Sequence, residues 1–140
     1  GPIEDSDDPN NLSIVLRVVY GETSFLFAGD AQTSEENDIL ASGRTVKSDV
    51  LKVGHHGSET STGADFLAAV APKYAVIEVG DSNSYNHPNQ GTLDRLKAAG
   101  VTLFRTDLQG TITCTSDGKA LTFQTGKTAS SDVFTKKDDD

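Results

Sequence analysis

All three histidines of this 140-residue chain lie in two short segments that follow apolar runs. His55 and His56 are adjacent within the sequence GHHGS, directly after residues 50–53, and His87 follows the apolar run 74–79. Imidazole is the commonest metal-binding side chain, and flanking glycines let the backbone approach a ligand closely. Neighbouring side chains on a strand point to opposite faces, so extended geometry favours at most one metal ligand here. The alternative interpretation is a turn with two exposed histidines.

Two further polar positions also follow expected strands. Asp30 comes directly after the apolar residues 24–28, and it either belongs to a site or begins a turn or caps the next helix. Asn83 and His87 follow the strand at 74–79, beyond the carboxyl end where open α/β sheets bind ligands. The alternative is a helix-entry loop in which Pro88 sets the geometry. Cys114, the single cysteine, excludes an internal disulfide and a cysteine-rich zinc site, and we interpret it as a small apolar group.

The elements that must position these residues alternate between strand and helix. Residues 24–28 are nearly all apolar, which predicts a strand that is buried on both faces. Thr33 and Glu36 predict a capping box, and Thr62 predicts the N-cap of a second helix. We expect strands at 12–20, 24–28, 50–53, 74–79, 101–105, 112–115 and 120–123, and helices at 33–42, 62–70 and 89–99. The order predicts an α/β layered domain with a mixed sheet.

Composition limits the organisation and the partners. The length suits one domain, and no apolar run approaches the 18 residues of a membrane span. Acidic residues outnumber basic ones by 21 to 12, a net charge of −9 that argues against general binding of a phosphate backbone. We assign residues 1–10 to an acidic lead-in loop, 11–125 to the folded domain and 126–140 to a polar linker or tail.

Several segments together resemble the metallo-β-lactamase superfamily. They are FLFAGD at 25–30, DVLKVGHHGS at 49–58 and NSYNHP at 83–88, with RTD at 105–107. More narrowly, residues 10–124 are similar to the hydrolase domain of the ComEC/Rec2 competence proteins. The resemblance implies an αββα sandwich, of which this chain is the second half, a mixed sheet with flanking helices.

The resemblance also implies roles at a site with two divalent metal ions, zinc or manganese. Asp30 would bridge the two ions, and His56 would be a metal ligand. His55 would support the metal ligands or face the substrate phosphate, and the alternative is that His55 rather than His56 ligates the metal. His87 would contact substrate, donate a proton or serve as the distal metal ligand. Ser58 and Asn83 would contact substrate; Ser58 is not a nucleophile elbow, which requires Gly-x-Ser-x-Gly.

One part of the superfamily pattern does not occur in this sequence. The main ligand cluster, His-x-His-x-Asp-His or its Thr-His variant, is absent, and Asp30 and the histidines cannot fill two metal shells alone. We therefore expect that cluster upstream, in an N-terminal half that is the partner of this chain, and we expect this chain alone to be inactive.

In the complete enzyme, the resemblance implies metal-dependent hydrolysis of DNA phosphodiesters during DNA uptake. It places the domain outside the cytoplasm, attached to a membrane only through a parent protein. One alternative is hydrolysis of a small phosphodiester or a phosphorylated surface group. Another is a non-catalytic binding module that retains the fold.

Overall fold

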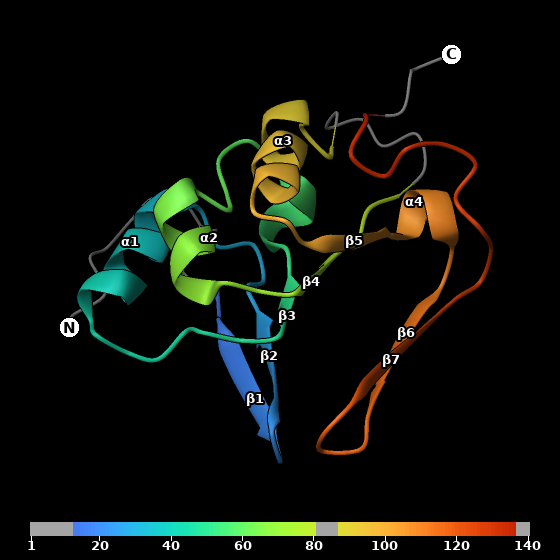
Figure 1. Ribbon diagram of the computed structural model, residues 1–140. Coiled ribbons are helices and arrows are strands. Elements are labelled where there is room, and N and C mark those ends of the chain that lie inside the picture. Colours follow the sequence, from blue (N-terminus) through green and yellow to red (C-terminus); the bar gives the residue numbers. More distant parts are fainter. Residues whose placement is uncertain (1–12, 81–86, 137–140) are drawn as a thin grey trace.

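The computed structural model describes residues 13–80 and 87–136 and contains one five-stranded mixed sheet. The strands lie in the order β1-β2-β3-β4-β5 (Figure 1). Their bounds are β1 Leu16–Tyr20, β2 Thr23–Phe27, β3 Val50–Lys52, β4 Tyr74–Ile77 and β5 Thr102–Arg105. β1 pairs with β2 in antiparallel orientation, and the other neighbours are parallel. The predicted α/β class with a mixed sheet and flanking helices is confirmed.

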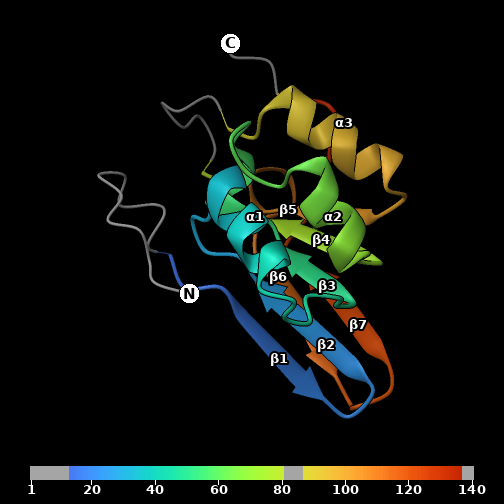
Figure 2. The same cartoon turned by 90° about the vertical axis from the view of Figure 1, so that its left-hand side faces the viewer.

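Three helices cover one face of this sheet: α1 Thr33–Ala41, α2 Ala64–Val70 and α3 Gln90–Ala98 (Figure 2). The alternate strand residues that point toward the helices form the core together with apolar helix side chains. This core includes Leu26, Leu51, Ala75, Ile77 and Leu103 from strands, and Phe66, Val70, Leu93 and Leu96 from helices. Within the described residues, no helix is long and apolar enough to cross a membrane.

A two-stranded hairpin lies on the opposite face of the sheet (Figure 2). It consists of β6 Ile112–Ser116 and β7 Leu121–Thr125, and a short helix, α4 Thr106–Gln109, that the sequence did not predict connects β5 to it. The Phe123 ring stacks on Phe104 with 4.4 Å between centroids and lies 4.7 Å from the Tyr74 ring. At the hairpin tip, the Glu22 amide donates to the Gly118 carbonyl at 2.6 Å. The hairpin is therefore held against the sheet near its middle, through Phe123, and at its tip.

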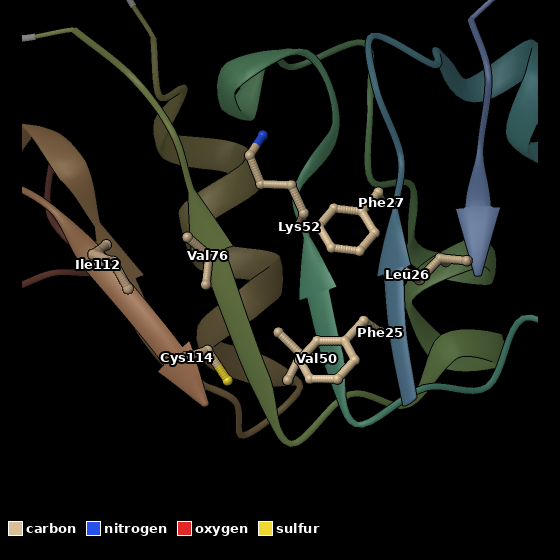
Figure 3. A pocket seen from close by; sticks show the side chains of 8 residues that line it. All are labelled: Phe25, Leu26, Phe27, Val50, Lys52, Val76, Ile112 and Cys114. Carbon is tan, nitrogen blue, oxygen red and sulfur yellow. The ribbon is translucent and has the colours of Figure 1, made fainter. Parts of the chain in front are cut away.

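The hairpin leaves the β1 and β2 side of this face open. Among the described residues, the exposed large apolar side chains on this face are Leu16, Val18, Tyr20 and Phe27, and Ile14 precedes β1; Val19 is also exposed but alternates to the other face. Phe27 is 44% exposed, so the prediction that residues 24–28 are buried on both faces is wrong. An apolar groove of about 250 Å³ continues from this open area to the hairpin (Figure 3). Its lining is Phe25, Leu26, Phe27, Val50, Lys52, Val76, Ile112 and Cys114.

Both predicted side-chain caps are wrong. The N-cap of α1 is Gln32 and that of α2 is Gly63, and neither makes a side-chain capping bond. The Glu36 carboxylate instead accepts hydrogen bonds from the backbone amides of Thr62, at 2.6 Å, and Gly63, at 2.9 Å. Tertiary bonding to the next loop therefore replaces the local capping box. The same bonds hold Thr62 at φ 56°, outside the geometry of an N-cap.

A candidate metal-binding site at the carboxyl ends of the parallel strands

The GHHGS segment forms a tight turn directly after β3. Residues Gly54–Gly57 make one 3₁₀-like turn, in which His55 has φ 50° and ψ 42° and His56 has φ 55° and ψ 27°. Both backbones are left-handed, which is uncommon for residues with a side chain and is concentrated at functional sites. The argument that adjacent histidines point to opposite faces assumed an extended strand, so it does not apply to this turn.

This turn lies directly against the turn that follows β2. The His55 amide donates to the Gly29 carbonyl at 2.9 Å. Gly54 permits the approach, because a Cβ there would lie 3.2 Å from the Ala31 carbonyl oxygen and 3.4 Å from the Ala28 Cβ. Asp30 and the two histidines are therefore brought to one edge of the sheet by neighbouring parallel strands.

The structure brings together two of the predicted metal ligands, Asp30 and His56. His56 Nε2 lies 3.9 Å from Asp30 Oδ1, and both side chains are about half exposed, at 49% and 47%. His56 Nδ1 lies 2.7 Å from the backbone carbonyl of Glu78. A carbonyl only accepts hydrogen bonds, so Nδ1 donates to it, and Nε2, on the Asp30 side of the ring, is the nitrogen that remains available to a metal ion. This is the orientation that a metal-binding histidine requires.

His87 completes a group of three imidazoles. Its ring centroid lies 5.6 Å from that of His55 and 6.4 Å from that of His56. Gly57, at φ 79°, allows this approach, because a Cβ there would lie 2.7 Å from the Pro88 Cβ. Burial lowers the pKa of His87, and the nearby His55, His56 and Lys136 lower it further.

Of the three remaining predicted positions, the structure describes His55 and Ser58. His55 Nδ1 is buried and has no hydrogen-bond partner among the described residues. Ser58 is buried, and its hydroxyl lies 3.0 Å from the Thr60 hydroxyl, so it shapes the loop; its role toward substrate stays a prediction. Asn83 lies outside the described residues.

Sequence reasoning missed two charged residues beside the site. Lys52 Nζ donates to the Val53 carbonyl at 3.3 Å and lies 3.9 Å from Glu78 Oε2. Burial lowers the pKa of Lys52, whereas the negative charges of Glu78 and Asp30 oppose that change. The signal was a lysine inside the otherwise apolar run VLKV, at the end of a strand.

The donor atoms fit part of a metal shell. Zinc lies roughly 2.0–2.2 Å from nitrogen and oxygen ligands, so one ion contacts both His56 Nε2 and Asp30 Oδ1 only when these atoms are within about 4.4 Å. The 3.9 Å separation satisfies this condition. A zinc site needs at least three protein ligands, and the part of the chain that the structure describes contains no such group of three. The described residues therefore supply some of the ligands and not a complete centre.

Comparison with known proteins gives a consistent assignment. Residues 2–80 match the model of the metallo-β-lactamase superfamily. The chain is 44% identical over 106 residues to "Competence protein ComA" of Neisseria gonorrhoeae and 41% identical over 108 residues to "ComE operon protein 3" of Bacillus subtilis. These alignments cover 75% and 77% of this chain but 15% and 14% of the relatives. A third relative, "Recombination protein 2" of Haemophilus influenzae, is 43% identical over 88 residues, which are 62% of this chain and 11% of that protein.

The family match and the site geometry agree on the same segments. The matched range includes the two turns that carry Asp30 and His56, and the fold is the mixed sheet with flanking helices that the family implies. The chain belongs to the metallo-β-lactamase superfamily.

Proposed function

We propose that this chain forms part of a metal-dependent hydrolase that cleaves DNA phosphodiesters during DNA uptake. The observation that carries the proposal is His56, whose Nδ1 is engaged by the Glu78 carbonyl while its Nε2 faces Asp30 at 3.9 Å. Membership of a superfamily with hydrolase members supports the hydrolytic reaction, and the competence proteins among the relatives support the DNA substrate.

Two divalent ions, zinc or manganese, would supply a Lewis acid and an activated water when bound. Asp30 and His56, through its Nε2, would be the residues of this chain that hold the ions. The Glu78 carbonyl fixes the ring of His56. His55 and His87, in edge contact with each other, would hold a non-bridging phosphate oxygen or move a proton to the leaving oxygen.

The partner in this proposal is the first half of the sandwich, which packs on the open apolar face of β1 and β2 and supplies the remaining ligands. Support comes from the exposed Leu16, Val18 and Phe27, which a second sheet would bury. The relatives are also several times longer than the matched stretch. We place the assembled domain outside the cytoplasm, attached to the membrane through the parent protein.

The test is metal analysis beside DNA cleavage in the complete protein. His56→Ala and Asp30→Ala should each lose bound metal and most cleavage, because each removes a ligand. His55→Ala should retain the metal, with cleavage reduced on the order of 10²- to 10⁴-fold, the usual range for a lost acid or base. Glu59→Ala, an exposed acidic residue in the same loop, is the control and should change neither quantity.

Three results would revise the proposal. Metal loss in His55→Ala with full occupancy in His56→Ala would exchange their roles. Cleavage of a small phosphodiester without cleavage of DNA would replace the substrate and keep the reaction. Wild-type levels of cleavage in all three variants would exclude these residues from the mechanism and favour a binding module.

A further inference from the structure

The side chain of Arg105, at the end of β5, connects the sheet to the C-terminal segment, residues 132–136. This guanidinium is fully buried, and it donates from Nε and Nη2 to the Asp107 carboxylate at 3.0 and 2.6 Å. Its Nη1 donates to the backbone carbonyls of Val133 and Thr135, both at 2.9 Å. A buried charge is tolerated when its hydrogen bonds are all made. Two of the acceptors come from the C-terminal segment, so that segment is part of the fold.

A second contact joins the same segment to the start of α3. The Gln90 side chain donates from Nε2 to the Phe134 carbonyl and accepts from the Lys136 amide, each at 2.8 Å. Val133 and Phe134 also pack against the hydrophobic core. The segment is therefore held by hydrogen bonds from the buried Arg105 guanidinium, by the two hydrogen bonds of the Gln90 side chain and by apolar packing. Figure 1 shows it returning to the beginning of α3.

This arrangement brings the backbone of Lys136 to the start of α3, just after the position of His87. Its backbone bonds to Gln90, three residues after His87, and the Asn89 amide in between donates to the Gly57 carbonyl at 2.8 Å. On the other side of the group of imidazoles, Lys52 is paired with Glu78 at 3.9 Å. The backbone position of Lys136 therefore allows its side chain to bring positive charge to the His87 side of a site that otherwise presents Asp30 and Glu78.

We propose that residues 132–136 form a wall of the site and that Lys136 binds a non-bridging oxygen of the substrate phosphate beside His87. A lysine ammonium is a compact point charge suited to phosphate oxygens. This inference rests on the proposed function for its substrate class. Arg105 and Gln90 act as positioning residues, because they hold the segment and do not touch the substrate.

The experiment measures hydrolysis of bis(para-nitrophenyl) phosphate by the complete protein. Lys136→Gln should raise KM about 10-fold, the loss of one charge-assisted hydrogen bond, with kcat little changed. Lys136→Arg should restore KM, and Lys127→Gln, at an exposed position outside the wall, should match wild type. Gln90→Ala should raise KM in the same direction. Equal KM values for wild type and Lys136→Gln would overturn the proposal.

A binding measurement separates this inference from the proposed function. If the wild-type protein hydrolyses no phosphodiester, the proposed function fails, and titration calorimetry with inorganic phosphate then tests the wall alone. Weaker phosphate binding by Lys136→Gln than by Lys127→Gln would support an anion site. Equal phosphate binding by wild type and Lys136→Gln would reject the anion site. The wall would also be rejected if residues 132–136 of Gln90→Ala resist trypsin and its KM is unchanged.

Discussion

Gly57 has no space for a side chain. An alanine there would adopt φ 79° and place its Cβ 2.7 Å from the Pro88 Cβ, so the loop that carries His87 would have to move. Left-handed backbone alone costs alanine roughly 1–2 kcal/mol. Gly43→Ala is the matched control, because it has φ 73° and nothing within 4 Å of the added Cβ. We expect Gly57→Ala to lower the free energy of unfolding more than Gly43→Ala does.

Chemical denaturation of the domain, co-expressed with the proposed N-terminal partner, measures both values. Gly57→Ala should also reduce metal content, since His56 lies in the same turn. Equal destabilisation by the two substitutions would contradict the close contact with Pro88.

The Glu36 carboxylate supports the loop that follows the histidine turn. Glu36→Gln replaces one carboxylate oxygen with an NH₂ group, which cannot accept from the amides of Thr62 and Gly63. We expect a loss of roughly 1–3 kcal/mol of unfolding free energy, the cost of leaving one buried amide without its acceptor. The same denaturation measurement on Glu59→Gln, at an exposed position, should give wild-type stability. No difference between the two variants would show that the loop does not depend on Glu36.

The sequence identified Asp30 and the three histidines as candidates because each follows an apolar strand. It did not predict the directions in which the His55 and His56 side chains point, because the left-handed turn depends on contacts with Gly29 and Ala31 in the turn that follows β2. Lys136 was missed for the same kind of reason. The position of the Lys136 backbone at the start of α3 depends on Gln90 and Arg105, which are 46 and 31 positions away in the chain.

At the scale of elements, the two hairpin tips depend on each other. Gly21, at φ 58°, lies so close to Gly118 that a Cβ would meet the Gly118 carbonyl oxygen. The hydroxyls of Thr23 and Ser116 also lie 2.6 Å apart across the same junction. Gly21→Ala should therefore separate the β6–β7 hairpin from the β1–β2 turn.

Hydrogen exchange of the β6 and β7 amides should report this separation as faster exchange at the tip. Gly100→Ala is the control, because it has φ 75° and open space around the added Cβ. Unchanged exchange in Gly21→Ala would show that Phe123, stacked on Phe104, fixes the hairpin without help from its tip.

The strands and helices were largely predictable, because strand and helix periodicities are local. Two of the wrong predictions involve tertiary contacts. Glu36 has the sequence pattern of a capping box, yet its carboxylate bonds to the loop at Thr62. Residues 24–28 are apolar throughout, but only the face that carries Leu26 is covered by the helices. The sequence alone does not distinguish a strand buried within one chain from a strand with one face available to a partner.

At the scale of the whole molecule, the open face of β1 and β2 should control association. We expect the isolated chain to self-associate, because contiguous exposed apolar side chains of this extent are rare on monomers. Val18→Lys should reduce the apparent mass of the isolated chain in light scattering and should prevent association with the proposed N-terminal partner. Lys119→Glu, in the hairpin turn, is the control for a change of charge. A sharp two-state melt of a strict monomer would contradict this account of the face.

The guanidinium of Arg105 also sets an order for folding during synthesis. Its carbonyl partners, Val133 and Thr135, are translated 28 and 30 residues later. Until they leave the ribosome, Nη1 has only water as a partner, and desolvating the arginine is unfavourable. The β4–β5 edge should therefore remain open while β1, β2 and β3 are already paired. A pause in translation shortly before residue 133 would prolong an intermediate whose last parallel strand is not yet locked, a state open to chaperones and proteases.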